Sequence, residues 1–137
     1  MITHMTTKVV PVRDQAAALA FYTDKLGFQV RLDAPFGEGS RWIEVAPPGA
    51  QTAIVLERAG EDEPRLGRFT GVIWSTADIH ATYAELQGRG VPFSEVPTMQ
   101  PWGMWQAQFD DQDGNGYVLI QAAQGDGAAA AAAAQTA

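Results

Sequence analysis

Few residues in this chain are able to carry catalysis or to bind a metal. The 137 residues include two histidines, His4 and His80, and no cysteine. Disulfides, thiolate metal sites and cysteine nucleophiles are therefore excluded. His4 lies in an N-terminal segment without a clear pattern, and we expect His80 to face solvent in the first turn of a helix. Neither histidine is placed to activate a serine, so the sequence does not support a hydrolase triad.

Three carboxylates cluster just before a glycine near the end of the chain: Asp110, Asp111 and Asp113 precede Gly114. An Asp-Gly dipeptide favours a tight turn, because glycine adopts positive φ freely and aspartate bonds nearby backbone groups. The apolar segment 117–120 that follows is typical of a core strand. We therefore interpret the carboxylates as turn and capping residues in solvent.

The other side chains suited to binding are aromatic. The chain has four tryptophans: Trp42, Trp74, Trp102 and Trp105. Trp102 follows Pro101 in an expected loop, and Phe36 stands between a proline and a glycine in a comparable loop. Loops carry binding residues more often than strand interiors do, and flat rings supply a large contact area. We expect Phe36 and Trp102 either to contact a ligand or to cover the core.

The elements that position these residues follow from hydrophobic periodicity and from capping signals. Asp14 and Asp78 are expected N-caps, and Gly27 and Gly90 are expected to end the two helices. The helices are predicted at 15–26 and 79–89, and the strands at 7–12, 28–32, 41–46, 52–57, 70–75, 91–96, 104–110 and 116–121. Pro11 lacks an amide hydrogen, which favours an edge strand, a bulge or a strand end.

The pattern repeats after 63 to 64 residues, which predicts two copies of one βαβββ unit. The matched pairs are Asp14 with Asp78, Gly27 with Gly90, Trp42 with Trp105, Val55 with Val118, and Leu56 with Leu119. We predict one domain over residues 1–124, with repeats at about 7–57 and 70–121. Residues 125–137 are rich in alanine and are predicted to form a disordered tail.

Two motifs, Phe21–Phe28 and the turn with its following strand at 113–120, resemble the vicinal-oxygen-chelate superfamily. This superfamily includes glyoxalase I, extradiol dioxygenases and bleomycin-resistance proteins. The resemblance implies an α+β fold in which two βαβββ modules with curved mixed sheets form a cleft. It also implies a homodimer, and the uncovered sheet faces favour one too.

In metal-dependent members of the superfamily, His or Glu side chains on four strands bind a divalent ion. The corresponding positions here are Thr7, Gly71, Val118 and either Val55 or Leu56. None of these residues is a good metal ligand. We expect Glu57 to reach the cleft only if its strand slips by one residue. The resemblance therefore predicts no metal and no cofactor.

Strand alternation divides the last two strands into two faces. Trp105 shares a face with Ala107 and Phe109, which indicates helix packing, whereas Gln106 and Gln108 are expected to face the cleft with Val118. Trp42 and Trp105 are interpreted as either core or ligand-binding residues, and Trp74 as core. The candidate ligand-binding residues are Phe36, Trp42, Trp102, Trp105, Gln106, Gln108 and Val118.

The net charge of −7, from 16 acidic and 9 basic residues, argues against nucleic-acid binding and is compatible with a cationic ligand. No apolar run is long enough to span a membrane, so we expect a cytoplasmic protein.

Three functions fit these features. The first is metal-free sequestration of an aromatic small molecule such as an antibiotic. The second is a lyase, isomerase or dioxygenase, either metal-dependent or cofactor-free. It would need polar groups in the cleft to orient a substrate, such as Gln106, Gln108, Arg41, Glu44 or Glu57. The third is an interaction module with a closed cleft.

Overall fold

The computed structural model describes residues 1–121, and the predicted tail at 125–137 lies outside this range. The chain divides into two compact units. The first comprises Met1–Arg68 with Asp111–Asn115, and the described part of the second comprises Phe69–Asp110 with residues 116–121. None of the helices within residues 1–121 is long and apolar enough to cross a membrane.

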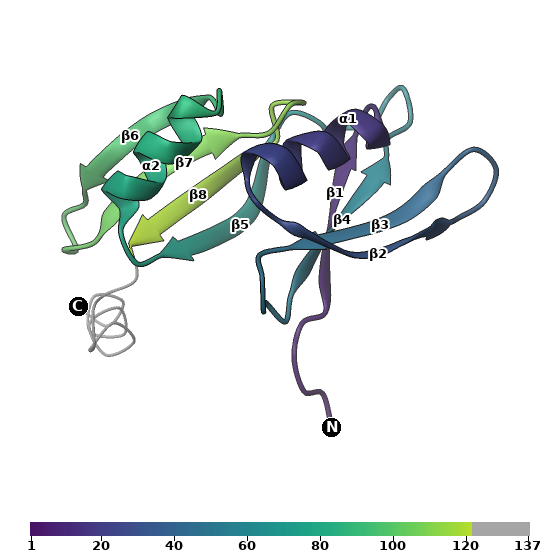
Figure 1. The fold of residues 1–137 in the computed structure, drawn as a ribbon, viewed down its shortest axis with the longest axis horizontal. Coiled ribbons are helices and arrows are strands. Elements are labelled where there is room, and N and C mark those ends of the chain that lie inside the picture. Colours follow the sequence, from purple (N-terminus) through teal and green to yellow (C-terminus); the bar gives the residue numbers. More distant parts are fainter. Residues whose placement is uncertain (122–137) are drawn as a thin grey trace. The chain divides into compact units, whose positions relative to one another are not determined.

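The first unit is a four-stranded mixed sheet with a helix (Figure 1). Its elements are β1 (Thr7–Val12), α1 (Gln15–Ala20), the π-helical turn η1 (Phe21–Lys25), β2 (Gln29–Pro35), β3 (Arg41–Ala46) and β4 (Ala53–Arg58). The strand order is β1-β4-β3-β2, with β1 parallel to β4 and the other pairs antiparallel. Because β1 is an edge strand, Pro11 is tolerated within it.

The second unit has the same connectivity. Its elements are β5 (Phe69–Thr76), α2 (Ile79–Gly88), β6 (Phe93–Met99), β7 (Trp105–Asp110) and β8 (Gly116–Gln121), with the strand order β5-β8-β7-β6. The predicted α+β class is therefore confirmed. The expected caps are also present, because Asp14 accepts from the amide of Ala17 at 3.0 Å and Asp78 accepts from that of Ala81 at 3.1 Å.

Three element predictions were wrong in detail. The strand predicted at 28–32 is β2, which continues to Pro35. The helix predicted at 15–26 is α-helical only to Ala20 and continues as η1, in which the wider turn keeps both Phe21 and Tyr22 buried. The strand predicted at 91–96 lies at Phe93–Met99 and runs through Pro97. This is possible because β6 is an edge strand with irregular pairing to β7, so the missing amide hydrogen of proline is tolerated.

The turn between β7 and β8 is held inside the first unit by Asp111. This residue caps the turn as predicted, but it is only 3% exposed, so the prediction that it does so in solvent was wrong. One carboxylate oxygen accepts from the amides of Asp113 and Asn115, at 2.8 and 3.0 Å. The other accepts from the Tyr22 hydroxyl at 2.7 Å and from the Asn115 side chain at 2.8 Å.

Asn115 extends this network to β1 and to the segment that follows β4. Its side-chain nitrogen donates to the carbonyl of Pro11 in β1, and its oxygen accepts from the amide of Gly67, at 2.8 and 2.9 Å. Asp113, which we expected to bond its own backbone, instead accepts from the amide of Arg13 at 2.9 Å. Side chains of one short turn therefore fix η1, β1 and the segment that follows β4.

Burial raises the pKa of Asp111, and this effect outweighs the hydrogen bonds from Tyr22 and Asn115, which favour the charged form. We expect Tyr22→Phe to lower the free energy of unfolding by about 1–3 kcal/mol, because it removes a donor from a buried carboxylate. A raised folded-state pKa means that ionisation of Asp111 costs stability as pH rises through that value. Without Tyr22 the cost grows, so the deficit of the variant should increase from pH 4 to pH 7.

Urea unfolding of both proteins across this pH range measures the effect. Tyr83→Phe is the matched control, because the Tyr83 ring packs edge-on against Phe93 and its hydroxyl has no hydrogen bond to any residue from 1 to 121. An equal or smaller loss in Tyr22→Phe than in this control would contradict the role given to Asp111.

Candidate functional site

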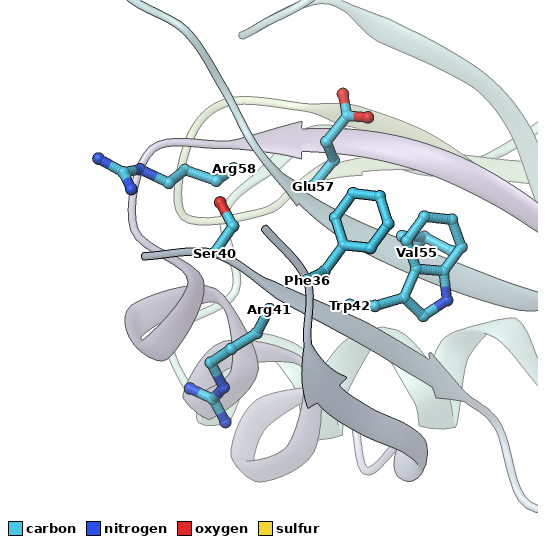
Figure 2. A pocket seen from close by; sticks show the side chains of 7 residues that line it. All are labelled: Phe36, Ser40, Arg41, Trp42, Val55, Glu57 and Arg58. Carbon is cyan, nitrogen blue, oxygen red and sulfur yellow. The ribbon is translucent and has the colours of Figure 1, made fainter. Parts of the chain in front are cut away.

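A pocket of about 240 Å³ opens on the first unit where the β2–β3 hairpin meets β4 (Figure 2). Its lining residues are Phe36, Ser40, Arg41, Trp42, Val55, Glu57 and Arg58. The hairpin supplies the first four, and β4 supplies the last three. All of them belong to the first unit, so this site is built within one half of the chain.

Strand pairing determines which residues face the pocket. Glu44 of β3 lies opposite Val55 of β4, and Val45 lies opposite Ile54. Directly paired residues share a face of the sheet, and so do residues two apart along a strand. Trp42 and Glu44 therefore share the pocket face with Val55 and Glu57.

Two aromatic rings form one wall of the pocket. The ring centroids of Phe36 and Trp42 are 5.4 Å apart, with an interplanar angle of 56°. Phe36 is held at the hairpin end by a hydrogen bond from its amide to the carbonyl of Ser40, at 3.0 Å. Phe36 remains 59% exposed, whereas Val55, which also lines the pocket, is buried. The wall is thus apolar and accessible from solvent.

A buried carboxylate fixes the orientation of Trp42. The indole Nε1 of Trp42 donates to one oxygen of Glu44 at 2.8 Å. The guanidinium of Arg31 donates to the other oxygen through two nitrogens, at 2.7 and 2.9 Å. Arg31 is held in turn by the carbonyls of Thr6 and Gln51. Since its only polar donor is occupied, Trp42 offers a ligand its apolar ring.

Burial of Glu44 by itself would raise its pKa, but the hydrogen bonds from Trp42 and Arg31, with the charge of Arg31, outweigh burial and lower the pKa. The carboxylate is therefore ionised at neutral pH, where it attracts Arg31.

The charged side chains around the pocket differ in their partners. Arg41 forms an ion pair with Asp33 of β2, and Glu57 forms one with Arg65, at 2.9 Å. Arg58 donates to the carbonyl of Gly39 at 3.1 Å.

Of the residues predicted to bind a ligand, only Phe36 and Trp42 line this pocket. The others belong to the second unit: Trp102, Trp105, Gln106, Gln108 and Val118. Gln108 pairs with Val118, and Gln106 two residues earlier shares their face, as the alternation predicts. Trp105 is on the opposite face, where its ring meets His80 of α2 at 4.6 Å. Trp102 is 52% exposed in the turn before β7.

The sequence prediction missed Ser40 and Arg58, and it named Arg41 only as a polar cleft group of the enzyme alternative. It expected Glu57 to reach the cleft only if its strand slipped. Glu57 lines the pocket without any slip, because Val55 two residues earlier is on the same face. Side chains two residues apart along a strand share a face, so Glu57 could have been identified once Val55 was assigned to the pocket face. Arg41 begins β3 and Arg58 ends β4. At such strand ends the alternation of side chains does not by itself predict which face a residue takes.

Comparison with known proteins identifies the family. The model of the Glyoxalase/Bleomycin resistance protein/Dioxygenase superfamily matches residues 2–119. The chain belongs to this superfamily. A member of the superfamily from Sphaerobacter thermophilus, solved by crystallography, is 38% identical over 88% of this chain and 98% of its own, with a TM-score of 0.82.

Two further relatives are similar over most of their length. TnmS3, described as an antibiotic binding protein from Streptomyces sp. CB03234, is 40% identical, with a TM-score of 0.77, over 88% of this chain and 96% of its own. The uncharacterised protein YetH of Bacillus subtilis is 35% identical over 87% of this chain and 98% of its own.

Strand pairing decides between the two residues of β4 that the resemblance gives as a possible metal position. In β4 the position on the pocket face is Val55, because Leu56 points to the other face. With Thr7, Gly71 and Val118 at the remaining positions, the donor set contains no imidazole and no carboxylate. Within residues 1–121 no three His, Cys, Asp or Glu side chains are grouped closely enough to hold a metal ion. These residues do not fit a divalent metal.

We expect Glu44→Gln to lower the free energy of unfolding by about 1–2 kcal/mol at pH 7, because it removes the charge that Arg31 binds and keeps an acceptor for Trp42. A lowered folded-state pKa contributes stability above the unfolded value of about 4.3, and this contribution is lost as pH falls through the folded value. The difference between the two proteins should therefore shrink at pH 3.

Chemical denaturation at pH 7 and pH 3 provides this comparison. Glu85→Gln is the control, since Glu85 pairs with Arg89 on the surface of α2 and its side chain is 62% exposed. A surface pair of this kind contributes about 0.3–0.5 kcal/mol. If both variants lost the same small amount of unfolding free energy at neutral pH, the ion pair between Glu44 and Arg31 would not be holding Trp42 in place.

Proposed function

We propose that this protein binds a planar aromatic small molecule in the pocket of the first unit, and that binding needs no metal. The observation that carries the proposal is the Phe36–Trp42 wall, with centroids 5.4 Å apart beside a buried valine. Offset or tilted aromatic contacts of this kind contribute about 0.5–1.5 kcal/mol beyond the area they bury.

The arrangement of Trp42 supports a binding role. A ring that is already fixed by Glu44 and Arg31 loses little side-chain entropy when a ligand stacks on it. Phe36 is more exposed, and its ring lies beside that of Trp42 in the pocket wall, where it can adjust to the outline of the ligand.

Similarity to TnmS3 supports the same proposal. That protein is described as antibiotic binding, and its 40% identity extends over 88% of this chain. We therefore propose sequestration of an antibiotic or a similar aromatic natural product.

An enzyme of the same superfamily is the alternative that the sequence leaves open. A metal-dependent form would need donors that Thr7, Val55 and Val118 do not provide. A cofactor-free form would need a free acid or base in the pocket, and the carboxylate there, Glu57, is in an ion pair with Arg65. Binding therefore accounts for the geometry better than catalysis does.

Ligand contacts by the candidate residues of the second unit, Trp102 foremost, remain part of the proposal. So does a homodimer, since Phe69, Ile73 and Val96 of that unit are more than half exposed and exposed apolar side chains favour association. Analytical ultracentrifugation at micromolar concentration would show a single monomeric species if the dimer were wrong.

We expect Phe36→Ala to weaken binding of an uncharged bicyclic probe, 2-naphthalenemethanol, by about fivefold to tenfold, because it removes one ring of the wall. Isothermal titration calorimetry of untagged, EDTA-treated protein gives the dissociation constants of the parent and the variant.

Phe69→Ala is the matched control, because Phe69 does not line this pocket and its exposure, 60%, is close to the 59% of Phe36. It should bind the probe as the parent does. Equal affinities in all three proteins, or binding that appears only after a divalent metal is added, would refute the proposed site.

A further inference from the structure

Two of the three charged side chains that line the pocket are in ion pairs with oppositely charged residues. Arg41 is neutralised by Asp33, and Glu57 is neutralised by Arg65. Arg58 has no ion pair with any residue in the range 1–121 and is held by one carbonyl, that of Gly39. The lining therefore carries one uncompensated positive charge, although the chain as a whole carries −7.

Building on the proposed aromatic binding, we infer that the ligand carries an anionic group, such as a carboxylate or phenolate, which is bound by Arg58 and the hydroxyl of Ser40. A guanidinium has five N–H donors, so a single bond to the Gly39 carbonyl leaves most of them for a ligand oxygen. Ser40 adds a hydroxyl that also lines the pocket. Hydrogen bonds from a charged donor to an anion are about twice as strong as neutral ones.

The two ends of the pocket differ in chemistry. Figure 2 shows Ser40 and the side chain of Arg58 at one end, and the rings of Phe36 and Trp42 toward the other. This separation suits an elongated molecule with an aromatic body and an acidic substituent. It does not suit a compact cation, because the positive charge of Arg58 would repel a cation bound in the same pocket.

Glycine at position 39 maintains the anionic end. Gly39 has φ of +69°, and a Cβ atom there would approach the Nη1 of Arg58 to 3.3 Å. A side chain at this position would strain the turn and crowd the guanidinium. The hairpin end is therefore shaped so that Arg58 can rest on a backbone carbonyl beside Ser40.

The negative total charge of the chain favours a cationic ligand only at long range. Salt screens charges beyond about 8–10 Å at physiological ionic strength. Selection within the pocket is therefore governed by Arg58, the lining group whose charge is not balanced by a neighbour.

Three probes with one ring system test the inference: 2-naphthoate, 2-naphthalenemethanol and 2-naphthylmethylamine. We expect naphthoate to bind the parent protein about fivefold more tightly than the alcohol, and the protonated amine to bind more weakly than the alcohol. Arg58→Met retains an apolar stem and should weaken the binding of naphthoate by a larger factor than the binding of the alcohol, so that the preference for naphthoate is lost. The preference should also decrease as sodium chloride is raised.

Arg68→Met is the control, since it changes the net charge equally and Arg68 does not line the pocket. The inference is supported if Arg68→Met keeps the preference for naphthoate over the alcohol and Arg58→Met loses it. Equal binding of all three probes, tighter binding of the amine, or an unchanged preference in Arg58→Met overturns the inference but leaves aromatic binding intact. Failure of all three probes to bind the parent overturns the proposed function as well.

Discussion

The carboxylate of Asp111 is the constraint on which the first unit depends. Four donors meet its two oxygens, and they come from the end of the first helix and from the turn between β7 and β8. Through Asn115 the same cluster bonds the carbonyl of Pro11 and the amide of Gly67. A turn that follows a strand of the second unit thus becomes part of the first. Pro11 lies in β1 directly opposite Glu57 of β4, and Glu57 lines the pocket together with Val55.

On this frame, the pocket is built by two kinds of interaction. Glu44, bound by Arg31 and Trp42, holds an indole ring so that its apolar surface faces the cavity. The hairpin end, closed by the Phe36–Ser40 backbone bond, adds a second ring and one arginine without a carboxylate partner in residues 1–121. Rigid rings with a single fixed charge are suited to recognising shape and one polar group.

Local signals in the sequence predicted much of the fold. The bounds of β1 and β8 and the caps at Asp14 and Asp78 depend on neighbours within a few residues. The repeat of one unit was visible because these local signals recur along the chain. Phe36 was also predictable, because proline and glycine placed it in a loop. The face of Trp105 also followed from its alternation with Gln106 and Gln108, and its ring does meet α2. The face of Trp42 did not follow from its match with Trp105, because Trp42 lines a pocket. Long-range pairing decides such faces, and it also decided the burial of Asp111 and the exposure of Glu57 to the pocket.

The measurement that tests this account most directly is two-dimensional NMR of the tryptophan indole N–H groups during titration with 2-naphthoate in the presence of EDTA. The four tryptophans give separate resonances, and Trp42→Phe assigns the one of interest. We predict that the Trp42 resonance moves most and saturates, because the ligand stacks on a ring whose N–H stays bound to Glu44. A stationary Trp42 resonance, with a saturable shift of Trp102 or Trp105, would contradict the account and move the binding site to the second unit.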